Sequence, residues 1–350
     1  FKGVAEQKIP RLTAGQLGVF LTQGDTDWSA LEPSILGTLF ERALNPAKRS
    51  QIGAHYTSRD DILLIVDPVI MAPLKRRWLD TQATVRDLIE QRDAARTPKA
   101  ALAAHAKIAG ALTEFHDHLA SVTVLDPACG SGNFLYVAIQ RLLDLEREVR
   151  AFAAAPAVIG GDGGKGTRFK EIQLDPRVGP GQLRGIEIDE YAAELARVAI
   201  WIGYLKWKRE NAILDHTPPI LSPLDTIEQR DAILDRSNPK KPKPARWPPV
   251  DFIVGNPPFL GTKMLRAGLG DDYVSTLFSI YEDRIPGFSD LCCYWFELAR
   301  EAIRTRPRTR VGLLATQAIR NGEARRVLER IKESGDIFMA WSDREWLLDG

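Results

Sequence analysis

The sequence predicts an α/β protein in which a helical N-terminal region precedes a mostly parallel sheet with helices on both faces. Two observations predict this class. Residues 122–125 form a short apolar run that leads into a glycine-rich turn and then a helix, as in the first unit of a nucleotide-binding sheet. Other apolar runs of strand length lie at 183–188, 251–254, 311–315 and 337–341. We expect the helical region to cover residues 1–118 and the α/β catalytic domain residues 119–350.

Composition is typical of a cytoplasmic enzyme. The 350 residues are enough for two domains. Of the three cysteines, Cys292 and Cys293 are adjacent and Cys129 lies in the glycine-rich turn, so no disulfide framework and no zinc site are expected. No uninterrupted apolar run reaches about 18 residues and the N-terminus does not resemble a signal peptide, so we expect no membrane segment and no secretion. The missing initial Met indicates a segment of a longer polypeptide.

In the N-terminal region, the clearest helices are expected at Ile35–Leu44 and over the Ala-rich stretch Val85–Leu119. A third helix is expected at Ile62–Val66, because Thr57 to Asp60 is typical of a capping segment.

The glycine-rich turn runs from Asp126 to Phe134 and precedes a helix whose apolar residues recur in pairs every four positions. It is not a dinucleotide fingerprint, because Leu135 occupies the position of the third glycine. Gly130 and Gly132 would let the backbone close on a ligand that lacks a pyrophosphate. Asp126 is placed to meet an ammonium group, so a zwitterionic amino-acid tail fits this turn.

The strand at 183–188 ends in Glu187, the candidate acceptor for ribose hydroxyls. It follows Asp126 by 61 positions (187 − 126) instead of about 20, which predicts an insertion loop at about 151–181. Part of this loop, 160–167, resembles a phosphate loop, but Lys165 is not followed by Ser or Thr. Residues 191–207 are apolar on almost every face, which predicts a buried helix.

The segment Asn256-Pro257-Pro258-Phe259 follows the apolar run Asp251–Val254 and indicates chemistry on an exocyclic amine. The side-chain oxygen of Asn256 and the carbonyl of Pro257 can accept hydrogen bonds from the two protons of an amino group and turn its lone pair toward an electrophile. The prolines hold both acceptors in place. Phe259 supplies a face for a base lifted out of its stack. Taken alone, the segment is equally typical of a proline-rich strand exit.

Basic residues cluster locally although the net charge is only +1. Lys263 and Arg266 follow Phe259 in a glycine-containing loop, where we expect them to meet DNA. The stretch Asn238–Pro249 is expected to be an exposed linker, whose lysines serve either solubility or phosphate contacts.

Together these motifs resemble a class I S-adenosylmethionine-dependent DNA methyltransferase of the γ group, which modifies adenine N6. From about Leu36 to the end, the chain is similar to the methylase portion of single-chain type II restriction–modification enzymes. The resemblance implies S-adenosyl-L-methionine as cofactor and double-stranded DNA as partner. It also implies a target-recognition domain in the parent polypeptide and leaves open whether a nuclease is attached.

The resemblance assigns a role to each motif residue. The segment at 53–58, with His55, Tyr56 and Thr57, would close over the methionine end of the cofactor. The other implied cofactor contacts are Asp126, Ala128, Gly130, Gly132, Phe134, Glu187, Ile188, Asp231 and Asp290. Purely structural interpretations remain for two of these residues. Asp231 is also typical of a solvated helix residue, and Asp290 is also typical of a cap for a helix at 291–303.

Other functions are weighed against this one. Methylation of cytosine N4, an RNA base or a protein glutamine is compatible with the Asn256 segment, although the His55-Tyr56 segment argues against the last two. Cytosine-C5 methylation is disfavoured, because Cys292 and Cys293 follow Leu291 rather than a proline. A DNA-binding subunit with a vestigial cofactor fold is a nonenzymatic alternative.

Overall fold

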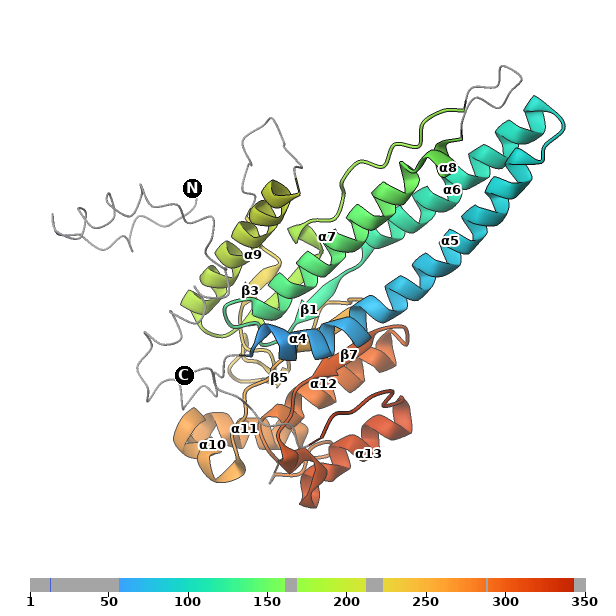
Figure 1. The fold of residues 1–350 in the computed structure, drawn as a ribbon. Coiled ribbons are helices and arrows are strands. Elements are labelled where there is room, and N and C mark those ends of the chain that lie inside the picture. The colour runs from blue at the N-terminus through green and yellow to red at the C-terminus, as the bar shows by residue number, and fades with distance from the viewer. Residues whose placement is uncertain (1–12, 14–56, 161–168, 212–222, 288, 343–350) are drawn as a thin grey trace. The chain divides into compact units, whose positions relative to one another are not determined.

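The computed structural model describes residues 13, 57–160, 169–211, 223–287 and 289–342 (Figure 1). The chain divides into two compact units, Phe1–Glu32 and Pro33–Gly350, and the elements described below belong to the second. The helix predicted at 35–44, together with His55 and Tyr56, lies outside the described residues.

A five-stranded parallel sheet forms the centre of the described region, in the order β3-β2-β1-β6-β7. This confirms the predicted fold class. The strands are β1 (Val124–Asp126), β2 (Leu183–Glu187), β3 (Ile227–Gln229), β6 (Phe252–Gly255) and β7 (Arg310–Leu313). Val124 lies opposite Leu183 on one side and Phe252 on the other. Because the strands are parallel, their carboxyl ends meet at one edge of the sheet, where ligands bind in such folds.

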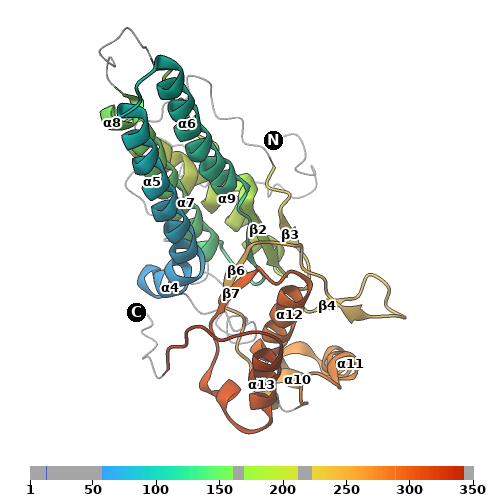
Figure 2. The same cartoon turned by 90° about the vertical axis from the view of Figure 1, so that its right-hand side faces the viewer.

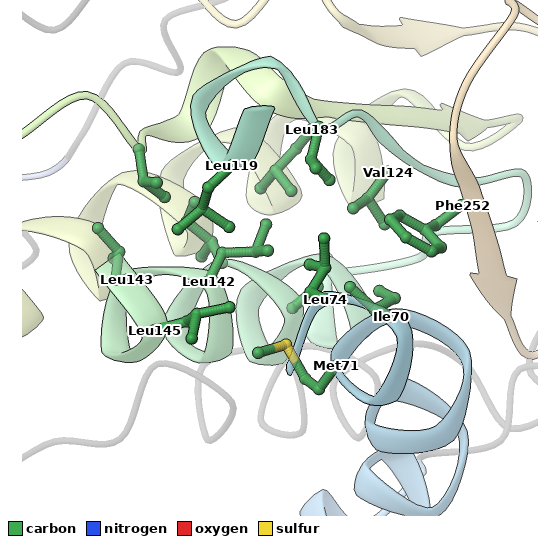
Figure 3. Close-up of a cluster of buried hydrophobic side chains, with 14 of the residues drawn as sticks. Ile70, Met71, Leu74, Leu119, Val124, Leu142, Leu143, Leu145, Leu183 and Phe252 are labelled. Carbon is green, nitrogen blue, oxygen red and sulfur yellow. The ribbon is translucent and has the colours of Figure 1, made fainter. Parts of the chain in front are cut away.

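Successive residues of the central strands enter two different hydrophobic cores, as the period of two in a strand requires. Val124 and Phe252 belong to the first core, which Figure 3 shows, and Leu125 and Ile253 to the second. Both faces of the sheet are therefore covered by helices.

The first core is built mainly from the N-terminal helices and from the two helices that follow β1 and β2. These are α4 (Arg59–Val66), which continues through a π-helical turn at Asp67–Met71, α5 (Ala72–Asp93), α6 (Pro98–Ser121), α7 (Asn133–Ala153) and α9 (Glu190–Glu210). Figure 1 shows α5, α6 and α7 side by side. The rings of Trp78 on α5 and Phe115 on α6 pack 4.9 Å apart. The predicted boundary at residues 118 and 119 thus does not separate two hydrophobic cores.

The second core contains helices from the C-terminal half of the chain: α10 (Thr262–Leu269), α11 (Asp271–Tyr281), α12 (Cys292–Thr305) and α13 (Arg325–Ser334). Short 3-10 turns at Gln317–Arg320 and Gly322–Ala324 precede α13. Between β3 and β6 the chain forms a small antiparallel hairpin of β4 (Leu234–Asp235) and β5 (Lys243–Pro244).

Several predicted elements differ from the structure. The stretch 85–119 is not one helix, because the chain turns between α5 and α6, where Thr97 caps Ala100 N and Pro98 begins the new helix. Residues 337–341 form no strand; the ring of Phe338 lies under the Arg310 guanidinium instead, 4.3 Å from it. The expected linker at 238–249 contains β5, and Lys263 and Arg266 lie on α10 rather than in a loop.

The helix predicted at 191–207 corresponds to α9, but it is not buried on every side: Tyr191 and Val198 are exposed. The predicted insertion at 151–181 begins with the end of α7 and the short helix α8 (Pro156–Ile159), and closes with a 3-10 turn at Pro180–Gln182. Buried Arg92 of α5 holds α8 by donating to the carbonyls of Ala157 and Val158. No helix in the described part of the chain has the length and apolarity to cross a bilayer.

Candidate active site at the carboxyl edge of the sheet

Three predicted site residues follow adjacent strands and meet at the carboxyl edge of the sheet. Asp126 ends β1, Glu187 ends β2 and Asn256 follows β6, and these strands are neighbours in the order β2-β1-β6. The backbone of Gly255 comes so close to Asp126 that a Cβ there would lie 2.5 Å from Asp126 Oδ1. The turn after β1 and the segment after β6 therefore line one site.

The turn after β1 is held by a hydrogen bond to Asp126 and by hydrogen bonds to the end of β2. Asp126 Oδ1 accepts from Ala128 N at 3.0 Å, and Cys129 N donates to Ile186 O of β2 at 3.1 Å. Gly130 N donates to Glu187 Oε2 at 2.8 Å, and Asp189 N donates to Glu187 Oε1 at 2.9 Å. Glu187 thus fixes the turn through Oε2, while Oε1 accepts from its own segment, and both oxygens keep further capacity to accept.

The two carboxyl groups at this edge are held in an environment that disfavours negative charge. Burial, followed by the negative charge of Glu187, raises the pKa of Asp126 to about 8, although the Ala128 N–H partly opposes the shift. Burial also raises the pKa of Glu187. A ligand that brings positive charge or hydroxyl donors to this edge would stabilise both carboxylates.

The two glycines of the turn play different parts. Both have positive φ, 51° at Gly130 and 88° at Gly132. A Cβ at Gly130 would point into open space, whereas one at Gly132 would lie 3.1 Å from the Cα and Cβ of Ala196 on α9. Gly132 is therefore required for packing against α9, and its close approach to a ligand stays a prediction. Phe134 lies in the first turn of α7, and its side chain is buried in the first core. It therefore anchors the start of α7, which follows the glycine-rich turn.

Ile188, directly after Glu187, keeps 59% of its side chain exposed at the end of β2. An exposed large apolar side chain beside the carboxylate that is predicted to bind ribose offers a surface for a flat apolar ring. Its contact with the cofactor stays a prediction.

The Asn256 segment is joined to the N-terminal motif. Asn256 Nδ2 donates to Thr57 Oγ1 at 3.0 Å, and Thr57 is buried. The next residue, Ser58, caps α4 by accepting from Asp61 N. Pro257 is buried and Phe259 half-buried. Thr57, the last of the predicted cofactor residues at 55–57, is thus in direct contact with Asn256, the predicted catalytic residue.

Helix α12 ties the Asn256 segment to the turn after β1. Asp290 Oδ1 accepts from Cys292 N at 3.1 Å, and from Leu260 N at 3.4 Å. Leu291 N donates to Leu260 O at 3.1 Å, and Trp295 Nε1 donates to Pro127 O at 2.9 Å. Asp290 therefore holds the first N–H group of α12 together with the backbone of Leu260, which follows the predicted catalytic segment. Trp295 was missed from the sequence, where a Trp on an apolar helical stripe indicates only a core residue.

Asp231, predicted to contact an adenine ring, holds a turn in the structure. Its Oδ1 accepts from the backbone N–H groups of Ile233 and Leu234, at 2.8 and 3.0 Å. Its Oδ2 accepts from Tyr273 Oη at 2.7 Å. The residue lies just after β3, at the same edge as Glu187. It can accept one further hydrogen bond at Oδ2.

The three cysteines are buried. Burial raises the pKa of Cys129. The pKa of Cys292 is raised mainly by its hydrogen bond with Cys293 and further by burial. Cys129 and Cys292 are therefore not poised as thiolate nucleophiles. Within the described ranges, no three His, Cys, Asp or Glu residues come together as metal ligands would.

The two basic residues predicted to meet DNA lie on the surface of α10. Lys263 is exposed. Arg266 is exposed too, but it pairs with Asp271 at 2.9 Å and lies over the ring of Phe278 at 5.9 Å. Its charge is therefore partly neutralised within the protein, and Lys263 is the stronger candidate of the two.

Residues 101–348 match the family model described as MmeI, DNA-methyltransferase domain. The chain belongs to this family. Its similarity to DNA methyltransferase A of Bacillus subtilis is 25% identity over 91% of the chain and 32% of that protein. It also resembles the structure of the type IIL restriction–modification enzyme MmeI in complex with DNA, with a TM-score of 0.67, 24% identity, and coverage of 94% of this chain and 40% of that one. The chain thus spans about a third of the first relative and 40% of the second.

Family membership makes this chain a DNA-methyltransferase domain of the MmeI type. That its site lies at the edge that carries Asp126, Glu187 and Asn256 stays a prediction. Family membership also confirms the resemblance drawn from the order of the motifs. The individual roles of the site residues in the MmeI-type domain remain predictions, which the geometry above makes specific.

Proposed function

We propose that this chain transfers a methyl group from S-adenosyl-L-methionine to the N6 amine of an adenine flipped out of double-stranded DNA. One observation carries the proposal: the Asn256 amide, at the carboxyl end of β6, donates through Nδ2 to Thr57. A planar amide held by its nitrogen has its oxygen on the other branch, so Oδ1 is oriented as an acceptor. This is the group that an exocyclic amine requires.

The residues beside this amide fit the proposed cofactor. Asp126 and Glu187 are carboxylates with raised pKa values, which an ammonium group and ribose hydroxyls would stabilise. The buried hydroxyl of Ser131 makes no hydrogen bond with the described residues, and Gly130 borders open space. When bound, the cofactor supplies an electrophilic methyl group on a sulfonium.

The chain's own contribution to the chemistry is positioning and electrostatics. Asn256 Oδ1 and Pro257 O would accept hydrogen bonds from the two N–H groups of the amine, which favours a tetrahedral nitrogen and directs its lone pair toward the methyl group. As the carbon–sulfur bond breaks and the carbon–nitrogen bond forms, the nitrogen would lose one proton to water. No strong base is needed for this, and the buried cysteines offer no covalent route. Half-buried Phe259 would stack on the extruded base and hold it in the site.

Adenine is favoured over the alternatives because the N-terminal motif takes part in the site. In the γ group, which this chain resembles, that motif precedes the glycine-rich turn, and here Thr57 contacts Asn256 directly. Cytosine N4, an RNA base and a protein glutamine carry the same amine or amide chemistry, so they are the runner-up substrates. A non-catalytic DNA-binding role is less favoured, since the acceptor residues and both carboxylates are in place.

The proposal extends to the longer protein in which such domains occur. MmeI is a type IIL restriction–modification enzyme, and its structure was determined with DNA. We infer that this chain modifies DNA within a restriction–modification or phage-defence enzyme of the cytoplasm, with sequence readout supplied by a target-recognition domain elsewhere in the polypeptide.

Nucleoside analysis tests the proposal directly. The full-length protein is incubated with methyl-labelled S-adenosyl-L-methionine and with duplex DNA, RNA or protein in parallel, and the products are hydrolysed and separated. Label in N6-methyladenine from duplex DNA alone is expected. Label in N4-methylcytosine, in RNA or in glutamine would instead select one of the runner-up substrates, and no transfer to any substrate would support the non-catalytic role.

A further inference from the structure

The β4–β5 hairpin is the most basic exposed element next to the site. Residues 235–249 hold five basic side chains and one acid, a net charge of +4 against +1 for the whole chain. All five basic residues are exposed: Arg236, Lys240, Lys241, Lys243 and Arg246. Only Lys243 among them forms an ion pair with a described residue, with Asp235 at 3.2 Å.

The tip of this hairpin is ordered by its own hydrogen bonds. Ser237 N donates to Asp235 Oδ1 at 3.0 Å, and Lys240 N donates to Asn238 Oδ1 at 3.1 Å. Lys241 N donates to Asn238 O at 3.0 Å. Prolines at 239, 242 and 244 restrict the backbone further. Such a turn loses little conformational entropy when its charges bind a partner.

The base of the hairpin is fastened to the residues around Asp231, at the carboxyl edge of the sheet. Trp247 Nε1 donates to Ala232 O at 2.8 Å, and Ala245 N to Ile233 O at 3.0 Å. Tyr281 Oη of α11 donates to the same Ile233 carbonyl at 2.7 Å. The charged tip is therefore presented from the edge that holds the site, and Figure 2 shows β4 projecting beyond α11.

We propose that this hairpin is a DNA-contacting arm that binds the phosphate backbone beside the flipped base. The charge of the hairpin indicates the kind of partner, because a tip with a net positive charge and a restricted backbone complements a polyanion. The tip also exposes no large apolar side chain, as an interface with a protein would use. Phosphate contacts of this kind position the duplex and carry no sequence information. The inference rests on the proposed function, because it takes duplex DNA as the substrate.

The test compares two charge-matched double variants of the full-length protein. Lys240→Gln with Lys241→Gln removes two charges from the arm. Arg96→Gln with Lys99→Gln removes two exposed charges, one from the turn between α5 and α6 and one from the start of α6, a region that lies far from the hairpin in Figure 1. Both pairs lie on the surface, so unchanged melting temperatures are expected. A Lys240→Arg, Lys241→Arg variant keeps the charge at the arm.

Binding of a labelled duplex is measured as a function of salt between about 0.05 and 0.2 M. The arm variant should reduce the slope of log affinity against log salt by about two, equally for cognate and non-cognate duplexes. The distal variant and the arginine variant should keep the wild-type slope. An arm variant with the wild-type slope and affinity would overturn the inference while leaving the proposed function intact. Failure of the wild-type protein to bind or methylate duplex DNA would overturn both.

Discussion

Asn256 and Thr57 are 199 positions apart in the chain, yet the Asn256 amide donates to the Thr57 hydroxyl at 3.0 Å. The contact joins the predicted catalytic segment to the motif that precedes α4. It makes Thr57 a positioning residue for the acceptor oxygen of Asn256, which gives a first prediction.

Thr57→Val removes the hydroxyl acceptor while nearly keeping the side-chain volume. Because one neutral hydrogen bond is lost from the residue that orients the reacting amine, the single-turnover methylation rate should fall about 10-fold. DNA affinity should stay near the wild-type value. Thr57→Ser, which restores the hydroxyl, should recover most of the rate. Equal rates for the Val variant and the wild type would show that Asn256 does not depend on this contact.

Asn256→Ala removes the acceptor itself. The methyl-transfer rate in a single turnover should drop about 10²- to 10³-fold, as for other preorganised polar groups at a reacting centre. Cofactor binding should be retained, since Asp126 and Glu187 are untouched. Asn256→Asp keeps an oxygen acceptor that Thr57 can also contact, so it should be faster than the Ala variant. If Asn256→Ala methylates DNA as fast as the wild type, the proposed role of this amide is wrong.

Glu187→Ala should weaken cofactor binding for two reasons. It removes the carboxylate expected to bind ribose, and it releases Gly130 N, which donates to Glu187 at 2.8 Å. Loss of hydrogen bonds to a charged group corresponds to about 10- to 150-fold in affinity, measurable by calorimetry. Glu171→Ala removes an exposed carboxylate and serves as the control. Unchanged cofactor affinity in the Glu187 variant would place the ribose elsewhere.

The two glycines of the turn should respond differently to the same substitution. Gly132→Ala adds a steric contact with Ala196 to the strain of a positive φ, so it should lower the free energy of unfolding by about 1–3 kcal/mol. Gly130→Ala carries the backbone strain alone, so it should destabilise less and instead impair cofactor binding. Denaturant unfolding of both variants measures the difference. Equal losses of stability would mean that packing against α9 is unimportant.

Asp126 makes stability depend on pH. Its pKa is raised to about 8 in the folded protein, so the folded state holds a proton that the unfolded chain releases near pH 4. Its contribution to stability is therefore complete below about pH 4 and is lost as pH rises through about 8, at up to about 1.4 kcal/mol per pH unit. The Asn side chain in Asp126→Asn does not titrate. Without ligand, this variant should therefore become more stable relative to the wild type as the pH rises from roughly 5 to 8.

Chemical denaturation at several pH values, without cofactor, tests this dependence on Asp126. Asp175→Asn, which changes an exposed carboxyl group, is the control. A wild-type pH profile in the Asp126 variant would contradict the assignment of the buried proton. The same variant should also bind cofactor weakly, because its amide cannot take a negative charge.

The parts of the fold that could be predicted are those whose signal is local. The run 122–125, the turn to Gly132 and the helical stripe that follows lie together in sequence, and all three appear in the structure as β1, the turn and α7. The same holds for the β2 strand with Glu187 and for α12. In each case, propensity, periodicity and the surrounding core agree.

The parts that could not be predicted depend on partners far along the chain. β3 and β4 are only three and two residues long, too short to show a period. The apolar segment 337–341 has strand propensity but no strand beside it, so propensity alone does not make it a strand. The break at Ala94–Thr97 carried a local signal, Thr97 before Pro98, which the high helix propensity of the alanines obscured.

For the site, residue types were predictable but their internal partners were not. Asp231 is tied to Tyr273, and Asp290 to Leu260, through contacts of 42 and 30 positions. These hydrogen bonds show that both carboxylates also hold neighbouring backbone and side-chain groups in place, which the sequence motifs alone do not indicate.

The residue at the start of α12, Leu291, hydrogen-bonds to Leu260 beside the Asn256 segment, and Trp295 within α12 hydrogen-bonds to Pro127 in the turn after β1. One helix thus connects the proposed site of the methyl acceptor with that of the methyl donor. A variant that shifts this helix, such as Trp295→Phe, is expected to lower methyl transfer equally for every DNA sequence tested. Under the proposed function, sequence preference and the alignment of the two reactants would then be separable properties.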